Sequence, residues 1–359
     1  MMSLRPRGVG LMIDLELRQR VRTVRWYIAL GIWFLLLTGM SVLIGLASMW
    51  LGTGSVFGDD LRLAGAIVFS ASVLLLIFAM LLVIPAMSSA AINGDRADGT
   101  LATLQATLLS PLEIVVGKVL AGWITGLAFL VAALPSVVPA ALLAGASPFY
   151  VARVIAMIAA LTLCITAIGV GLSSLTNRPL GSVVLSYLVV LGTTTILPIV
   201  FACAAPFVVW KHEVTVYETE YTSGSMDAGR CVKTQEVRDV VRTDLLMPLL
   251  WLNPFVIVAD TAPQIPIGQD DIGPGDIDAL RGISTLVRYL AHPTHPSHFV
   301  ECWDTEAEGY PKDLEQPWTL PVWPMGLGAH ALVAAGAVAV ATYRIKAPVR
   351  RLGTGTRIA

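Results

Sequence analysis

The chain has 359 residues and a formal net charge of −1, with 55% hydrophobic and only 14% charged residues. An average soluble protein has about 25% charged residues, so a soluble chain of this length could not cover its surface with so few charges. This composition excludes soluble enzymes, disordered or collagen-like chains and nucleic-acid-binding domains, and it predicts a protein that is solvated largely by lipid.

The first segment, residues 1–26, is rich in arginine and predicts an amphipathic helix that lies on the inner membrane surface. At about 100° per residue the helix has two faces. The apolar face consists of Ile13, Leu17, Val21 and Val24, and the basic face of Arg18, Arg22 and Arg25. Such a helix can rest its apolar face among lipid tails and its arginines among phosphates. The alternative is that the segment only continues into the first span as a positive anchor.

Six apolar stretches are long enough to cross a bilayer, which needs about 20 helical residues. They lie at about residues 26–51, 63–85, 120–143, 151–175, 183–210 and 323–343. We therefore expect an all-α polytopic membrane protein, with transmembrane helices 1–5 within residues 27–210 and helix 6 within residues 321–343. An even number of crossings places both chain ends on the same side of the membrane.

Lysine and arginine in short loops mark the cytoplasmic side of a membrane protein. Residues 1–26 and the tail at 344–359 are both basic, so we expect both ends in the cytoplasm, whereas most carboxylates fall on the other side. The chain is then a multi-pass protein of the cell membrane, in a bacterium the inner membrane. Residues 211–320 form an extracytoplasmic domain between helices 5 and 6.

Within the outer domain, residues 214–217 alternate like a short strand. The apolar patch at 249–260 is too short to cross a bilayer, so it is a re-entrant or interfacial piece, or the core of the outer domain. Cys231 and Cys302 both lie on the oxidising side, whereas Cys164 and Cys203 lie inside spans. We therefore predict a disulfide between Cys231 and Cys302.

Three histidines, His292, His295 and His298, have a spacing that can ligate zinc or copper. Pro293 and Pro296 would break the helix that aligns them. We predict a solvated loop and no metal site.

The predicted spans contain no carboxylate that could bind a coupling ion and no set of protease groups. A phosphate-binding loop is also missing, since Gly117 and Lys118 are followed by Val119. We therefore expect no catalytic activity and no cofactor in this chain. If the protein moves a substrate, a partner must supply the energy.

The inner loop at residues 86–118 predicts a polar break, a short helix and the start of a second helix. Leu101, Leu104 and Leu108 recur at helical spacing, after a turn at Gly99-Thr100. Ser110-Pro111-Leu112-Glu113 is typical of a helix start, with a capping serine, a proline at the first position and an acid near the positive end. The segment is either a docking element or an ordinary connecting loop.

The residues of this loop resemble a motif of the membrane subunits of type-2 ATP-binding-cassette (ABC) exporters. The resemblance is carried by Ala91-Ile92-x-x-Asp95-Arg96-x-x-Gly99-Thr100-Leu101, then Leu104, Ser110-Pro111-Leu112 and Gly117-Lys118. Asp95 stands where the family more often has glutamate. Leu252-Asn253-Pro254-Phe255 also resembles a family element between spans five and six.

The resemblance implies a permease subunit that forms a homodimer or pairs with a related permease. It would dock on a separate ATPase that holds ATP and Mg, and export a substrate by alternating access. Residues 1–26 would be the connecting helix, and 86–118 would contain the coupling helix. The 175–182 turn, with Asn177 and Arg178, would be a second contact. The implied coupling residues are Asp95, Arg96, Asp98, Gly99, Thr100, Leu101, Leu104, Pro111, Glu113, Gly117, Lys118 and Arg178.

Two questions stay open at the level of sequence. The polar residues Gly192 to Thr195 in span five would line a translocation path or serve as helix-packing residues. The whole chain has an alternative function as a non-transporting membrane anchor or sensor that presents its outer domain. We expect membrane lipids as further partners, and no nucleic acid.

Overall fold

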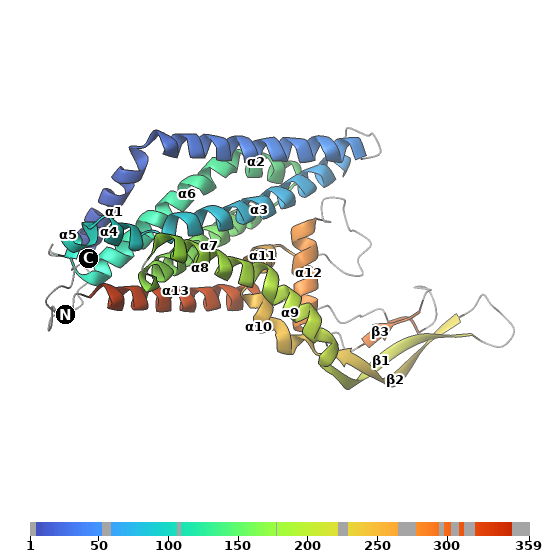
Figure 1. The fold of residues 1–359 in the computed structure, drawn as a ribbon. Coiled ribbons are helices and arrows are strands. Elements are labelled where there is room, and N and C mark those ends of the chain that lie inside the picture. The colour runs from blue at the N-terminus through green and yellow to red at the C-terminus, as the bar shows by residue number, and fades with distance from the viewer. Residues whose placement is uncertain are drawn as a thin grey trace.

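Long helices lie side by side over most of the chain, and a small sheet extends from one end of the bundle (Figure 1). The computed structural model describes residues 5–51, 59–105, 109–176, 178–221, 229–264, 278–293, 298–302, 309–311 and 320–346. Most of the predicted tail at 344–359 lies outside these residues. We call the end that carries α1 (Pro6–Val21), α4 (Asn93–Ala97) and α5 (Thr100–Gln105) the inner end.

Among the described residues, six stretches are long and apolar enough to cross a membrane, which confirms the predicted number of spans. Five of them are single helices: α2 (Val24–Leu51), α3 (Asp59–Ser88), α6 (Pro111–Leu143), α7 (Pro148–Leu175) and α13 (Trp323–Ile345). The fifth in chain order is built from α8 (Pro179–Leu191), the π-helix η1 (Gly192–Ile196), α9 (Leu197–Ala204) and the 3-10 helix η2 (Ala205–Phe207).

Local sequence explains where these helices begin. Ser110 and Ser147 each accept a hydrogen bond from a backbone N–H of the first turn that follows, and a proline comes directly after each serine. A capping hydroxyl satisfies an otherwise unpaired donor, and proline costs nothing at the first helical position. The third and fourth spans therefore start at residues 111 and 148, before the apolar stretches predicted at 120–143 and 151–175.

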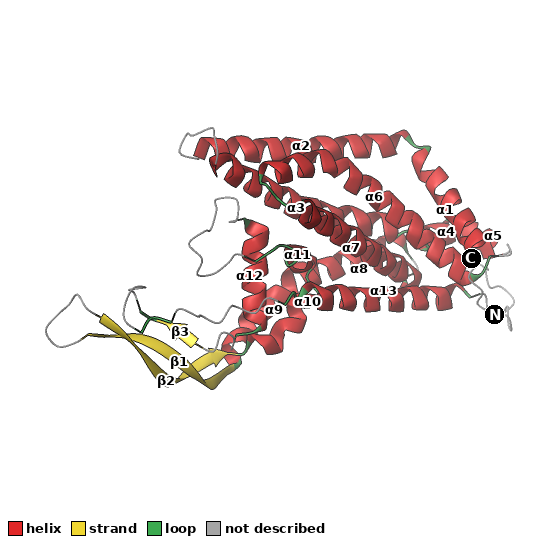
Figure 2. Cartoon of the chain, turned by 180° about the vertical axis from the view of Figure 1, so that it is seen from behind, coloured by secondary structure: helices red, strands yellow, loops and turns green. Residues whose placement is uncertain are grey.

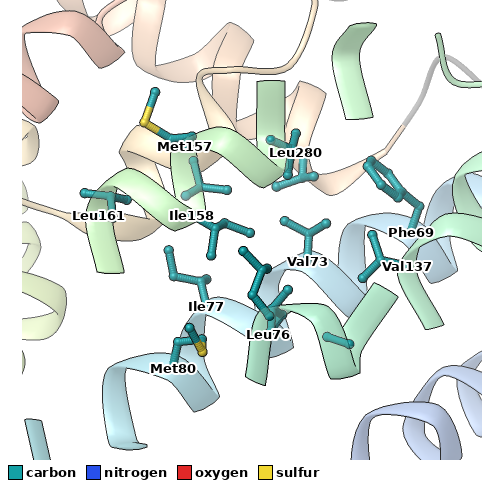
Figure 3. Packing of buried hydrophobic residues seen from close by; sticks show 14 of the residues in the cluster. Phe69, Val73, Leu76, Ile77, Met80, Val137, Met157, Ile158, Leu161 and Leu280 are labelled. Atoms are coloured by element: carbon teal, nitrogen blue, oxygen red, sulfur yellow. The ribbon is translucent and has the colours of Figure 1, made fainter. Parts of the chain in front are cut away.

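The centre of the bundle is formed by α3, which packs against both α6 and α7 (Figure 3). Phe69, Val73, Leu76, Ile77 and Met80 of α3 face Val137 of α6 and Met157, Ile158 and Leu161 of α7. At Gly122 and Gly126, a Cβ atom would lie 2.7 and 2.6 Å from the methyl groups of Thr166 and Thr162. Helices in lipid associate through such close packing of small residues, since lipid tails are as apolar as the side chains.

The outer segment contains a three-stranded sheet, so it is not helical throughout. Strand β1 (Val209–Tyr221) pairs antiparallel with β2 (Gly229–Val241) and parallel with the short β3 (His298–Val300). The strand predicted at 214–217 is confirmed and is part of a longer one, in which Val214 and Val216 are buried. Cys231 of β2 forms a disulfide with Cys302, which follows β3.

Charged side chains surround Arg238 on this sheet. Its guanidinium donates hydrogen bonds to Glu236 at 3.0 Å and to Glu301 at 2.6 Å. The hydrogen bond from Arg238 holds the pKa of Glu301 below its usual value. Partial burial, followed by repulsion from Glu236, raises the pKa of Glu218. The Arg238–Glu301 pair therefore joins β2 to the residue that follows β3.

The predicted histidine cluster is divided between elements. His292 follows α12 (Ala279–Ala291), His298 lies in β3, and His295 lies outside the described residues. Within the described part of the chain, no three potential metal ligands come together.

The apolar patch at 249–260 folds into short helices that pack against the spans. After the 3-10 helix η3 (Thr243–Leu246) come α10 (Met247–Trp251) and α11 (Pro254–Ala259). Asn253 caps α11 by accepting a hydrogen bond from the Phe255 N–H at 2.9 Å, and its amide donates to the Thr194 carbonyl at 3.3 Å. Ile257, Val258 and Ala259 join the core formed by α3 and α7. The patch thus packs against the spans at the end of the bundle opposite α1, which we call the outer end.

A buried ion pair at this outer end joins three elements. The fully buried carboxylate of Asp260, at the end of α11, accepts hydrogen bonds from Arg288 Nε of α12 at 2.6 Å and from Ser284 at 3.3 Å. Its other oxygen accepts from the backbone N–H groups of Val322 and Trp323 at 2.5 and 2.7 Å, where α13 begins. Asp260 therefore fixes the start of the last span relative to the outer helices.

We predict that Asp260→Ala destabilises the protein by about 3–5 kcal/mol, because it removes the carboxylate that pairs with the buried Arg288 guanidinium and that accepts from the Val322 and Trp323 N–H groups. Thermal unfolding of the detergent-solubilised protein, followed by size-exclusion chromatography, measures the loss. The matched control is Asp244→Ala, whose partner Arg242 is 29% exposed, and this change should cost less than about 1 kcal/mol. Equal losses in the two variants would show that Asp260 has no special role.

Candidate functional site: the inner surface

Helix α1 crosses the inner part of α6 and packs closely against it (Figure 2). Its buried residues are Gly8, Val9 and Met12. A Cβ atom at Gly117 of α6 would lie 2.5 Å from Met12 Cβ, so only glycine permits this contact. The helical prediction for this segment is confirmed.

The predicted apolar face of residues 10–26 is not the face that packs against α6, and its contact with lipid tails stays a prediction. Val21 and Val24 are 42% and 72% exposed, and Ile13 and Leu17 are only half-buried. The buried face is instead selected by Gly117, which lets the α1 backbone approach α6 along the side that carries Met12. Hydrophobic periodicity within residues 10–26 contains no information on that glycine.

The start of α6 is held by a complete capping box. Ser110 Oγ accepts a hydrogen bond from the Glu113 N–H, and Glu113 Oε2 accepts one from the Ser110 N–H at 2.7 Å. Glu113 Oε1 also accepts from the Arg5 backbone N–H at 2.8 Å, just before α1. The carboxylate is fully buried, and a Cβ atom at Gly8 would lie 2.9 Å from its Cδ. Pro111 is half-buried at the first position of α6.

Lys118 of α6 joins three elements of the inner end. Its ammonium, in a side chain only 2% exposed, pairs with Glu16 of α1 and with Asp95 of α4, the latter at 2.6 Å. An unpaired buried ammonium would be costly, whereas two carboxylates satisfy it. The sequence motif therefore combines Asp95 and Lys118 in one ion-pair cluster that also includes Glu16.

After Asp95, which pairs with Lys118, the chain turns sharply and forms the predicted short helix. Gly99 has a positive φ of 72°, which glycine adopts at no steric cost, and α5 begins at Thr100. The Thr100 hydroxyl donates to the Asp95 carbonyl at 3.3 Å. Leu101 is buried in a cluster with Ile92, and Leu104 is half-buried. Leu108 lies outside the described residues.

A polar network anchors this segment to the turn between α7 and α8. The Asn93 amide donates to Thr176 Oγ1 at 2.7 Å and to Ser182 Oγ at 3.2 Å. The Asn93 and Ile92 N–H groups donate to Ser173 Oγ, and Ser182 donates to the Ser89 carbonyl at 2.6 Å. The two inner segments predicted to contact an ATPase thus form one connected surface.

The predicted coupling residues divide by exposure. Asp98, Gly99, Thr100 and Arg178 are exposed. Arg96 is half-buried, and its guanidinium makes long hydrogen bonds of 3.4 Å to Asn93 and to the Thr176 carbonyl. The buried or half-buried residues Asp95, Leu101, Leu104, Pro111, Glu113, Gly117 and Lys118 support that surface from beneath. Asn177 lies outside the described residues.

Sequence reasoning missed Glu16, Asn93, Ser173 and Ser182. A carboxylate in a strongly basic segment was the available signal for Glu16. The other three are small polar residues with no distinctive pattern, and only the fold shows that they contact one another.

Inside the bundle, a cavity of about 220 Å³ lies between α3, α7, α8 and α13. Its lining is apolar except for Ser186, Thr193 and His330. Thr193 and Thr194 donate their hydroxyl protons to backbone carbonyls one turn earlier, a bond that satisfies these hydroxyls within their own helix.

The model of the ABC-2 family of transporter proteins matches residues 12–292 of the chain. The chain belongs to the ABC-2 transporter family. It is therefore a multi-pass membrane protein and an ABC transporter permease subunit. The match includes α1 from Met12 onward, both inner segments and the outer segment through α12. No curated protein matches the chain.

We predict that Lys118→Met lowers the stability of this ABC-2 permease by about 3–5 kcal/mol, because Asp95 and Glu16 lose the buried ammonium that pairs with both, and Glu16 keeps only its 3.8 Å pair with Arg20. The triple variant Lys118→Met, Glu16→Gln, Asp95→Asn removes all three charges and should recover most of the loss. Thermal unfolding in detergent measures both.

The control for this prediction is Arg18→Met, which breaks the exposed pair with Asp14 and should cost less than about 1 kcal/mol. If the triple variant is no more stable than Lys118→Met, the loss does not come from unpaired charge.

Proposed function

We propose that this permease subunit exports its substrate by alternating access, driven by ATP hydrolysis on a separate ATPase that docks at the inner surface. The observation that carries the proposal is the exposed α4–α5 segment, which lies beside the α7–α8 turn and is connected to four spans. It continues from α3, pairs through Asp95 with Lys118 of α6, and contacts α7 and α8 through Asn93. A displacement of this surface would therefore reach α3, α6, α7 and α8 together.

The exposed groups of the surface suit a polar protein contact. Asp98 and Arg178 present opposite charges on either side of the Asn93 network, and Leu180, which is 74% exposed, adds an apolar contact. ATP and Mg would be bound by the partner, since this chain supplies only the contact surface. The inner end then faces the cytoplasm, as its arginines favour.

Pairing of two permease subunits is supported by the spans that are least covered. Most of α2 and of the α8–α9 span is exposed, including Leu35, Leu43, Val184 and Leu188. A second copy or a related permease, as well as lipid, can cover these apolar faces. A translocation path between two subunits would open alternately to the two sides of the membrane as the inner surfaces move.

The docking surface is tested by charge reversal. We expect Asp98→Lys and Arg178→Glu each to reduce recovery of the ATPase subunit about tenfold in a mild-detergent pulldown, because like charges then face each other across the interface. Mass spectrometry of the pulldown identifies the ATPase subunit that is recovered. ATPase stimulation by the permease should fall in parallel.

The matched control is Lys211→Glu, a reversal at an exposed residue of β1 on the outer sheet, which should leave recovery unchanged. Failure to recover an ATPase with the unmodified protein would favour the alternative of a membrane anchor or sensor. Unchanged recovery in both inner variants would place the contact elsewhere.

A further inference from the structure

A groove of about 580 Å³ lies beside the elbow where α1 meets α2, between α2 and the helices α3 and α6. Figure 2 shows this elbow at the inner end, with α6 and α3 beneath α2. Arg20, Thr23 and Arg25 line one end of the groove. The rest of the lining is apolar, and it includes Trp26, Trp33, Val83, Met87 and Phe129.

The apolar wall is built to keep its shape. Trp33 Nε1–H donates a hydrogen bond to the Phe129 carbonyl at 3.0 Å. The rings of Trp26 and Trp33 both pack edge-on against the Phe129 ring, with centroids 5.2 Å apart in each pair. Aromatic pairs of this geometry stabilise each other beyond the area that they bury. The groove is thus a preformed surface, and its outer rim at Ile32 is 59% exposed.

The basic end of the groove has an excess of positive charge. The groove lining includes two arginines and no carboxylate. Arg20 is 19% exposed, and its ion pair with Glu16 is long, at 3.8 Å, because Glu16 also pairs with Lys118. Arg25 is exposed at the start of α2. An arginine guanidinium suits phosphate, which it can bind through two parallel hydrogen bonds.

The length of the groove matches one leaflet of a bilayer. Its lining on α2 runs from Trp26 to Leu36, which corresponds to about 15 Å of helix at 1.5 Å per residue. The hydrocarbon core of a bilayer is about 30 Å thick, so one leaflet accounts for about half of that depth. Basic pockets between spans on the cytoplasmic side are suited to acidic lipid head groups.

We propose that this groove is a binding site for an acidic phospholipid of the inner leaflet, with the phosphate at Arg20 and Arg25 and an acyl chain against Trp26, Trp33 and Phe129. A bound lipid fills the space between the α1–α2 elbow and α3 and α6. The site is separate from the docking surface, so its test does not depend on the ATPase.

Native mass spectrometry of the full-length protein, with phosphatidylglycerol or phosphatidylcholine added in turn, tests the proposal. We expect the unmodified protein to retain phosphatidylglycerol about tenfold more than phosphatidylcholine, and the double variant Arg20→Gln, Arg25→Gln to lose this preference. The control double variant Arg7→Gln, Arg18→Gln removes the same charge from exposed positions of α1 outside the groove. It should keep the preference for phosphatidylglycerol. Equal retention of the two lipids by the unmodified protein, or equal behaviour of the two double variants, would overturn the proposal.

A second pair of variants tests the acyl chain without any change of charge. Ala29→Trp fills the groove and should lower phosphatidylglycerol retention about tenfold, whereas Ile28→Trp, at an exposed position outside the groove lining, should not. Excess inorganic phosphate should compete only weakly, because it lacks the chain. If phosphate displaces the lipid completely, or Ala29→Trp retains it fully, the groove does not bind a lipid.

Discussion

The arrangement of the inner end depends on one buried ammonium. Lys118 lies near the start of α6 with almost no exposure to solvent. Glu16 and Asp95 are the carboxylates that neutralise its charge. Moving either carboxylate away would leave uncompensated charge in a medium of low dielectric constant. The ion pairs therefore hold α1, α4 and α6 in a fixed relation, although α1 is far from the other two in the sequence.

Polar groups fasten both ends of the bundle, and close apolar packing fills its middle. Asn93 extends the inner unit to the turn between α7 and α8, while Asp260 and Arg288 fix the outer helices to the start of α13. Between them, helices approach closely at glycines such as Gly126. The ends of the bundle are rigid, and the described core between them has no ionic cross-links. This arrangement suits a membrane subunit in which groups of connected helices move together.

The sequence was sufficient for features that depend on local pattern. Hydropathy found six spans, and Ser110-Pro111 with Glu113 predicted a helix start, because each signal lies within a few residues. It was insufficient for contacts between distant segments. Glu16 and Lys118 are 102 residues apart, and nothing near Asp260 indicates Arg288. The face of α1 that packs against α6 was not predicted for the same reason, since Gly117 of another helix determines it.

Pulsed electron paramagnetic resonance measures most directly whether α1 and the docking segment move as one unit. Labels at Arg18→Cys and Ala97→Cys, in a Cys203→Ser background and diluted with unlabelled subunits, report the distance between α1 and the α4–α5 turn. With the ATPase bound, one unchanged, narrow distance with and without nucleotide is expected, and Lys118→Met should broaden it. A distance that shifts with nucleotide in the protein with intact Lys118 would show that the ion pairs do not join these helices into a unit.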